Sequence, residues 1–138
     1  MPEPFQFDLV SPERLLLSEP VDEVIVPGTE GDFGALPGHA NLISLIRPGV
    51  IYVYMGGQVT QRIFVGGGFA EVTATGCTVL AEQAMPVGDI DRATVEKEIA
   101  DAREDVEDAK NDEARVLAQA ALKVAEAKLA AVTEPSVY

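Results

Sequence analysis

The sequence predicts two parts of different fold class: an N-terminal antiparallel β-sandwich followed by a C-terminal α-helical hairpin. All twelve glycines lie at or before Gly88, and no proline lies between Pro86 and Pro135. Twelve of the fifty residues after Gly88 are alanine, the residue with the highest helix propensity. Because turn-forming residues stop where alanine becomes frequent, we expect a β domain over residues 1–86 and a helical domain over residues 87–138.

Alternating and β-branched segments predict the strands of the first part. Residues 5–10 (FQFDLV) alternate apolar and polar side chains, the pattern of a half-buried strand. Residues 21–28 (VDEVIVPG) form a β-branched run that ends at a turn. Residues 49–65 predict a hairpin that turns at Gly56–Gly57, and residues 69–82 predict a second one. No long crossover helix is predicted between these strands, so we expect a mainly antiparallel sandwich or flattened barrel.

Two apolar stripes with alternating spacings of four and three predict helices over residues 91–110 and 113–132. Asp89 or Asp91 is the expected cap of the first helix. The short link between the helices predicts an antiparallel hairpin, whose seam of small side chains buries little apolar area. The residues of the two stripes are Val95, Ile99, Ala102, Val106 and Ala109, and then Ala118, Leu122, Ala125, Leu129 and Val132.

Composition narrows the classes of function. The protein has 23 acidic residues against 10 Lys and Arg, a formal net charge of −13 at pH 7. Such a charge repels DNA, RNA and anionic lipid headgroups, so we expect no nucleic-acid partner. No apolar stretch reaches about 18 residues, which predicts no direct membrane insertion. The single cysteine, Cys77, excludes an internal disulfide, and no secretory signal is visible, so we expect a protein of a reducing, cytosolic compartment.

Residues 27–42 (PGTEGDFGALPGHANL) form a loop-like segment with four glycines and the only histidine, His39. A phosphate-binding loop is disfavoured because Glu30 and Asp32 would repel the anion and no GxxxxGK[ST] motif is present. A metal centre on His39 would need two or more further His or Cys ligands, which the sequence does not supply. Cys77 lies on a predicted strand, where a buried small hydrophobe is expected rather than a nucleophile. We therefore predict no catalytic residue, no metal and no cofactor, which leaves a protein that acts by interaction with others.

Three segments resemble the epsilon subunit of the F-type, rotary ATP synthase. They are residues 24–51 (VIVPGTEGDFGALPGHANLISLIRPGVI), 64–72 (FVGGGFAEV) and 79–84 (VLAEQA), and their order and spacing match over nearly the whole sequence. The resemblance implies a β-sandwich of about ten strands followed by two helices, in agreement with the elements predicted above. It also implies a non-catalytic central-stalk subunit that couples rotation of the c-ring to ATP synthesis, with regulation of ATP hydrolysis by the helical hairpin.

The resemblance implies partners and a location as well. The partners are the gamma subunit, the c-ring and, through the hairpin, the alpha/beta head, at the cytoplasmic face of the bacterial inner membrane. The acidic turn Glu30-Gly31-Asp32 is implied to meet polar, arginine-bearing loops of the c-ring, and the segment around His39 to lie close to gamma and the ring. An alternative of another class is a stand-alone sandwich with a helical hairpin that senses a nucleotide or metabolite.

In many members of the family, ATP binds the hairpin through Ile or Leu, Asp, two variable residues, Arg and Ala. Ile90 and Asp91 match the first two positions, but Thr94 stands where Arg is required. A shifted frame recovers Arg92 but places Gly88 at the aliphatic position. Because the missing guanidinium is a charge-assisted donor to phosphate, we expect ATP binding to be weak or absent.

Overall fold

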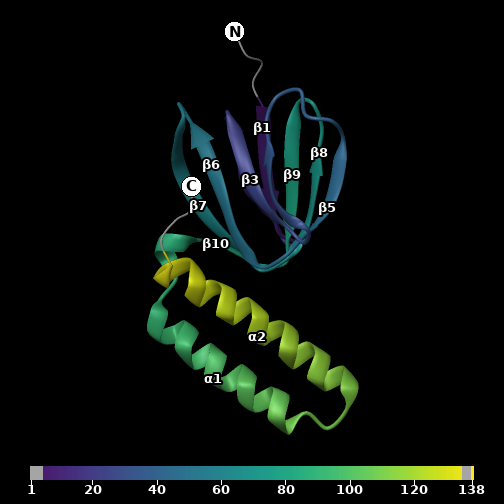
Figure 1. Ribbon diagram of the computed structural model, residues 1–138, viewed down its shortest axis with the longest axis vertical. Coiled ribbons are helices and arrows are strands. Elements are labelled where there is room, and N and C mark those ends of the chain that lie inside the picture. The colour runs from purple at the N-terminus through teal and green to yellow at the C-terminus, as the bar shows by residue number, and fades with distance from the viewer. Residues whose placement is uncertain (1–4, 135–137) are drawn as a thin grey trace. The chain divides into compact units, whose positions relative to one another are not determined.

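The computed structural model describes residues 5–134 and residue 138, which form two compact units (Figure 1). One unit extends to Pro86 and includes Tyr138, and the other begins at Val87. The first unit is a ten-stranded, mostly antiparallel sheet, and the second contains two long helices. The predicted fold class, a β-sandwich followed by a helical hairpin, is confirmed.

The sheet runs in the order β10-β7-β6-β3-β5-β8-β9-β1-β2, with β4 paired to β3. All neighbouring strands are antiparallel except β1 and β9, which are parallel. The strands are β1 (Phe5–Val10), β2 (Leu15–Val21), β3 (Glu23–Gly28), β4 (Gly31–Ala35), β5 (Leu42–Ile46), β6 (Gly49–Met55), β7 (Gln58–Val65), β8 (Gly68–Val72), β9 (Gly76–Ala81) and β10 (Ala84–Pro86).

Most of the core of the sandwich comes from alternate residues along its strands, although β6 and β7 also bury consecutive side chains. In β1, Phe5 and Phe7 are fully buried, whereas Gln6 lies on the opposite face and donates from Nε2 to Oγ of Ser18 at 2.8 Å. The alternation predicted for residues 5–10 is therefore confirmed. The other fully buried large side chains come from strands on both sides of the core and include Val24, Val26, Ile51, Val53, Phe64, Val65, Val72 and Val79.

The two predicted hairpins are present as β6–β7 and β8–β9. Gly56 and Gly57 form the two-residue turn of the first, with φ angles of 62° and 77°. Two consecutive positive φ angles are what a tight hairpin turn requires, and glycine adopts them without steric cost. The amide of Gly56 also donates to Oδ2 of Asp22 at 2.6 Å, which fixes the turn to the preceding β2–β3 corner.

The loop expected over residues 27–42 is only partly correct. Residues 31–35 form β4, which pairs with β3 along its whole length, and Leu42 already belongs to β5. The segment GDFGA has low intrinsic strand propensity, because two of its five residues are glycine. Pairing with β3 and burial of Ala35 override that propensity. Only residues 36–41 link the strands without regular structure.

The second unit begins with a short 3-10 turn, η1 (Val87–Asp89), followed by α1 (Arg92–Asp108) and α2 (Asp112–Thr133). Val95, Ile99 and Ala125 form its small apolar cluster, with Ile90, Leu122 and Leu129 packed against it. Lys128 is also buried, and its Nζ donates to Oε2 of Glu98 across the two helices at 3.3 Å. Within the described residues, neither helix has the length and apolar content of a bilayer-crossing segment.

Cys77 on β9 is 1% exposed, and burial raises the pKa of its thiol to about 12. Because the thiolate is the reactive form, the native protein should resist modification by Ellman's reagent at pH 8. Complete modification is expected only when the protein is unfolded in denaturant. Rapid stoichiometric labelling of the folded protein would contradict this placement of Cys77 in the core.

Candidate partner-binding surface

The predicted acidic turn forms the end of the β3–β4 hairpin. The two strands pair up to Gly28 and Gly31, so Thr29 and Glu30 are the two turn residues. Gly31 has a φ of 131°, a conformation that residues with a side chain rarely adopt. A Cβ atom on Gly28 would lie 2.8 Å from the carbonyl oxygen of Gly31. Glycine is therefore required on both sides of the turn, and these two residues set the position of the acidic side chains.

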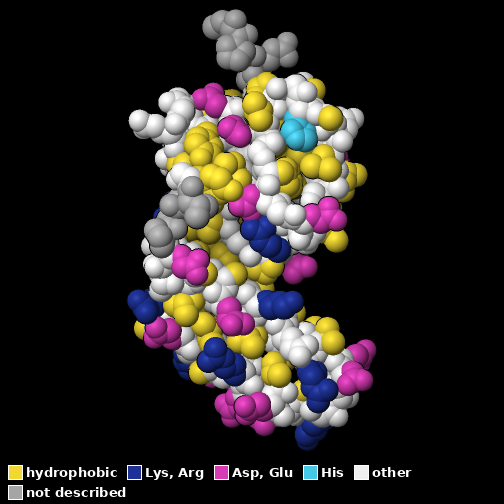
Figure 2. All heavy atoms as spheres, viewed as in Figure 1, with side chains coloured by type: hydrophobic (Ala, Val, Ile, Leu, Met, Phe, Trp, Pro, Cys, Tyr) yellow, Lys and Arg dark blue, Asp and Glu magenta, His cyan; other side chains and the backbone are white. Residues whose placement is uncertain are grey.

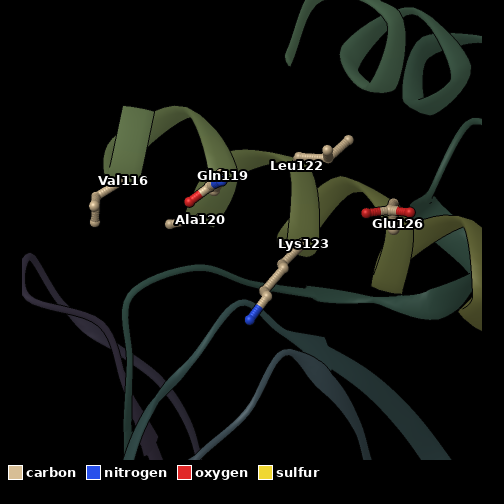
Figure 3. A pocket seen from close by; sticks show the side chains of 6 residues that line it. All are labelled: Val116, Gln119, Ala120, Leu122, Lys123 and Glu126. Carbon is tan, nitrogen blue, oxygen red and sulfur yellow. The ribbon is translucent and has the colours of Figure 1, made fainter. Parts of the chain in front are cut away.

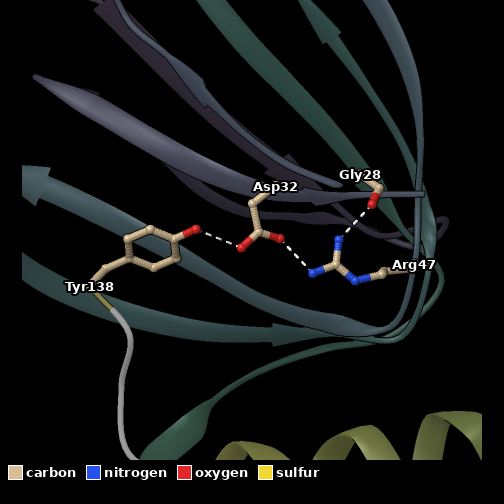
Figure 4. Close-up of polar contacts among 4 residues, drawn as sticks. All are labelled: Gly28, Asp32, Arg47 and Tyr138. Atoms are coloured by element: carbon tan, nitrogen blue, oxygen red, sulfur yellow. Dashed lines mark hydrogen bonds and ion pairs between the residues drawn. The ribbon is translucent and has the colours of Figure 1, made fainter. Parts of the chain in front are cut away.

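Asp32, on β4 next to this turn, is held by an arginine and a tyrosine (Figure 4). Nη2 of Arg47 donates to Oδ1 of Asp32 at 2.5 Å, and the hydroxyl of Tyr138 donates to Oδ2 at 2.7 Å. Nη1 of Arg47 donates to the carbonyl oxygen of Gly28. Burial raises the pKa of Asp32, but the hydrogen bonds from Tyr138 and Arg47 and the charge of Arg47 outweigh it and hold the pKa below its ordinary value. Asp32 is therefore ionised at neutral pH.

Glu30 differs from Asp32 in its surroundings. Its side chain is exposed at the tip of the turn, and among the described residues it makes no hydrogen bond or ion pair. The structure therefore brings the two predicted acids together on one hairpin. Of these two, Asp32 has internal partners, and Glu30 has none among the described residues. An incoming cation meets one available carboxylate and one that is already engaged.

His39 lies in the link between β4 and β5, and no hydrogen bond or ion pair within the described residues joins it to the acidic turn. Its side chain is half-buried, with Nδ1 2.5 Å from the carbonyl oxygen of Ala40. The amide of the preceding residue, Gly38, donates to the carbonyl oxygen of Ala74 at 2.8 Å. The link is thus tied through Gly38 to the turn between β8 and β9.

An exposed apolar patch, formed by Ile43, Leu45 and Phe69, was not predicted from the sequence. The register of β5 and β8 pairs Leu45 with Phe69, and Ile43 lies two residues from Leu45 on the same face. Ile43 is 73% exposed, Leu45 67% and Phe69 42%. Figure 2 shows that hydrophobic side chains reach the surface of the sandwich between acidic ones. Clustered exposed apolar side chains are typical of a surface that binds another protein.

The apolar patch and the acidic turn are joined through the backbone of β5. The amide of Thr29, in the turn, donates to the carbonyl oxygen of Leu45 at 3.0 Å. The amide of Arg47, which follows β5, donates to the carbonyl oxygen of Pro27 at 2.9 Å. Leu45 and Arg47 therefore both adjoin the acidic turn. Leu45 carries a side chain of the apolar patch, and Arg47 carries the guanidinium that binds Asp32. The two features are therefore neighbours in the first unit.

The degenerate nucleotide motif begins the first helix of the second unit. Asp91 is the N-cap of α1, and its Oδ2 accepts hydrogen bonds from the amide of Thr94 at 3.3 Å and from Oγ1 of Thr94 at 2.6 Å. These bonds lower the pKa of Asp91. The guanidinium of Arg92, the cation of the shifted frame, pairs with Glu96 at 3.1 Å. Thr94 thus completes a helix cap at the position where the motif requires a phosphate-binding arginine.

ATP should therefore bind this protein weakly or not at all. A lost charge-assisted hydrogen bond to phosphate weakens binding by about 1.5–3 kcal/mol. Thr94→Arg supplies the guanidinium and should tighten binding relative to the unchanged protein. Isothermal titration calorimetry with both proteins makes the comparison. A dissociation constant in the low micromolar range for the unchanged protein, about −8 kcal/mol of binding free energy, would contradict the expectation.

A hollow on the second helix offers no better nucleotide site. Its described lining comes entirely from α2, where Lys123 is the only cation and lies one turn from Glu126 (Figure 3). Triphosphate sites usually combine several cations or backbone amides. The other side chains of the lining are Val116, Gln119, Ala120 and Leu122.

Comparison with known proteins covers both units. Residues 4–87 match the beta-sandwich domain of the ATP synthase Delta/Epsilon chain, and residues 91–138 match the C-terminal domain of the ATP synthase epsilon chain. This protein belongs to the ATP synthase epsilon chain family. The resemblance found in residues 24–51, 64–72 and 79–84 is thereby confirmed. Epsilon chains are non-catalytic subunits of ATP synthase, a membrane-associated complex.

Relatives within the epsilon chain family match over most of their length. The ATP synthase epsilon chain of Rhodospirillum rubrum is 51% identical over 131 residues, which cover 95% of this protein and 98% of that relative. The epsilon chain of Parvibaculum lavamentivorans is 56% identical over 115 residues, covering 83% of this protein and 87% of the other. The family match favours a subunit of this complex over a stand-alone sensor.

Solved structures agree with the epsilon chain assignment. One subunit in the cryo-EM structure of the Euglena gracilis mitochondrial ATP synthase (OSCP/F1/c-ring, rotational state 1) superposes with a TM-score of 0.80 at 25% identity, covering 96% of this protein and 83% of the other. One subunit in the central stalk/c-ring structure of Tetrahymena thermophila mitochondrial ATP synthase superposes with a TM-score of 0.66 at 15% identity. The superposition covers 95% of this protein and 98% of the other. At that identity the second likeness concerns the fold alone.

Proposed function

We propose that this epsilon chain is a rotor subunit in the central stalk of a proton-translocating bacterial ATP synthase. It couples rotation of the c-ring to ATP synthesis and has no active site of its own. The observation that carries the proposal is that backbone hydrogen bonds join the acidic turn to the strand that carries the exposed side chains of Ile43 and Leu45. The surface of the sandwich thus offers two neighbouring features of different chemistry to its partners.

The two parts of the surface suit different partners. Glu30 and Asp32 carry negative charge at a narrow turn, which suits polar, arginine-bearing loops of the c-ring. The apolar patch, near the link that contains His39, suits the gamma subunit, because apolar side chains are buried at the centre of stable protein interfaces. The ring contact is steered by charge, and the gamma contact gains most of its free energy from burial.

The location and the role of the second unit follow from the same assignment. The protein is peripheral, at the cytoplasmic face of the bacterial inner membrane, and it is held there by the c-ring rather than by lipid. The helical hairpin reaches the alpha/beta head and regulates ATP hydrolysis there. The small apolar cluster around Val95, Ile99 and Ala125 supports a mobile role for the hairpin, since few large side chains hold its helices together.

The test of the proposal uses inverted membrane vesicles from cells that lack this protein. ATP-driven proton pumping is followed by quenching of a pH-sensitive dye, and ATP hydrolysis is measured in parallel. We expect pumping to be lost without the protein and restored when it is expressed again. Pumping that is unaffected by the deletion would refute a coupling role.

A further inference from the structure

The side chain of Tyr138 makes directional contacts with the sandwich. Its hydroxyl donates to Oδ2 of Asp32 at 2.7 Å. Its ring meets the ring of Tyr52 edge to face, with the centroids 4.9 Å apart and an interplanar angle of 67°. Tyr52 is itself only 8% exposed, and the guanidinium of Arg62 lies 6.0 Å from its ring centroid. Edge-to-face contact is the favoured geometry of aromatic pairs, so Tyr138 has a defined seat on β6.

The two groups that bind Asp32 differ in how firmly they belong to the hairpin. Arg47 is fixed to the hairpin three times, through its backbone amide to Pro27, through Nη1 to Gly28 and through Nη2 to Asp32. Tyr138 is 106 positions from Asp32 in the sequence and lies outside the strands of the sheet. The position of the arginine is therefore set by the backbone of the neighbouring strands, whereas the tyrosine is the contact that can be exchanged.

The charge of Asp32 strengthens the contact with Tyr138. The hydrogen bond to Asp32 raises the pKa of the Tyr138 phenol, with smaller contributions from burial and from nearby charge. The same bond helps to lower the pKa of Asp32. A neutral hydroxyl bound to a carboxylate is nevertheless a weaker partner than a guanidinium or an ammonium group, which adds a full opposite charge.

We propose that Tyr138 is a displaceable cap on Asp32, an autoinhibitory contact within this subunit that competes with the cationic side chain of a docking partner for Oδ2. The inference rests on the proposed function, because the partner is the arginine-bearing loop of the c-ring. Glu30, exposed and without an internal partner among the described residues, makes the first contact. Displacement of Tyr138 then frees Oδ2 of Asp32 for the second contact. Before docking, the subunit therefore offers the ring the carboxylate of Glu30 but not Oδ2 of Asp32.

Binding to the c-ring in lipid nanodiscs tests the competition. The full-length subunit is titrated at low ionic strength, as the unchanged protein and as Tyr138→Phe, which keeps the ring but removes the hydroxyl. We expect Tyr138→Phe to bind about threefold to tenfold more tightly, the range of one net hydrogen bond. In the background of Asp32→Asn the same substitution should have no effect. Tyr54→Phe, which removes a hydroxyl from β6, is the matched control and should bind like the unchanged protein.

A second measurement tests the cap without the ring. Tyrosine residues labelled with 13C are titrated by NMR, and Tyr138→Phe assigns the signal of Tyr138. Asp32→Asn should lower the titration midpoint of Tyr138. A midpoint that Asp32→Asn leaves unchanged would overturn the cap alone, as would unchanged affinity of Tyr138→Phe for the ring while Asp32→Asn still weakens binding. Failure of the unchanged subunit to bind the ring would overturn ring docking in the proposed function, and with it the competition.

Discussion

Reversal of charge at the acidic turn should uncouple ATP hydrolysis from proton pumping while the protein stays folded. In the double variant Glu30→Lys, Asp32→Lys, two positive charges face arginine-bearing loops of the ring, and such like-charge juxtaposition costs several kcal/mol at an interface. The same substitutions should lower the folding stability of the isolated sandwich by less than this. Glu30 is an exposed turn residue, and Asp32 loses a partly exposed ion pair with Arg47 and a hydrogen bond from Tyr138, which together cost about 1–2 kcal/mol.

The measurement compares dye quenching and ATP hydrolysis in vesicles that contain the double variant. Glu13→Lys, in the exposed turn between β1 and β2, is the matched control, because it changes charge in the same direction at another turn. High salt should weaken the unchanged contact as well, since it screens exposed charges beyond about 8–10 Å. Full coupling in a folded double variant would show that the acidic turn does not dock electrostatically on the ring.

Polar substitution of the apolar patch should abolish stable binding to gamma. Ile43→Ser with Leu45→Ser removes two side chains that are 73% and 67% exposed in the isolated subunit. Burial of an aliphatic side chain at an interface contributes about 1.5–3 kcal/mol, so the pair should weaken binding by at least about a hundredfold. The sandwich itself loses little, because these side chains contribute mostly to its surface.

Binding to purified gamma is measured by surface plasmon resonance, and the midpoint of thermal unfolding is recorded for each variant. Leu15→Ser is the matched control, since Leu15 is 57% exposed and lies on β2. The control should bind gamma like the unchanged protein. Equal affinity of the double variant and the control would show that the patch formed by Ile43, Leu45 and Phe69 is not the gamma contact.

Much of the fold was predictable because local patterns and tertiary packing agree. The period-two alternation of residues 5–10 matches the buried face of β1, and Gly56–Gly57 occupies a turn that needs two positive φ angles. The alternating spacings of four and three placed Val95, Ile99 and Ala125 on the facing sides of α1 and α2. Local sequence determines these features, so one segment at a time is sufficient to predict them.

The features that were missed depend on residues far apart in the sequence. The sequence predicts a loop where β4 lies, because the glycines of β4 conceal a strand that its pairing with β3 stabilises. The partners of Asp32 are 15 and 106 positions away, and no local pattern predicts them. The patch on β5 was missed because LISLI is apolar on both faces, so the buried face, which includes Ile46, does not stand out from the exposed one. The sequence signal that could have indicated an exposed apolar patch is a short apolar segment without alternation of polar residues.

The central claim, that this epsilon chain is a stalk subunit, is tested most directly by capture of the intact complex. The protein is tagged in its own host, the membranes are solubilised in mild detergent, and the captured proteins are identified and quantified by mass spectrometry. We expect one assembly that contains alpha, beta, gamma and c subunits, with the tagged protein and gamma in equal amounts. Recovery of the tagged protein without gamma and c subunits, from membranes in which the rest of the synthase is intact, would contradict the claim.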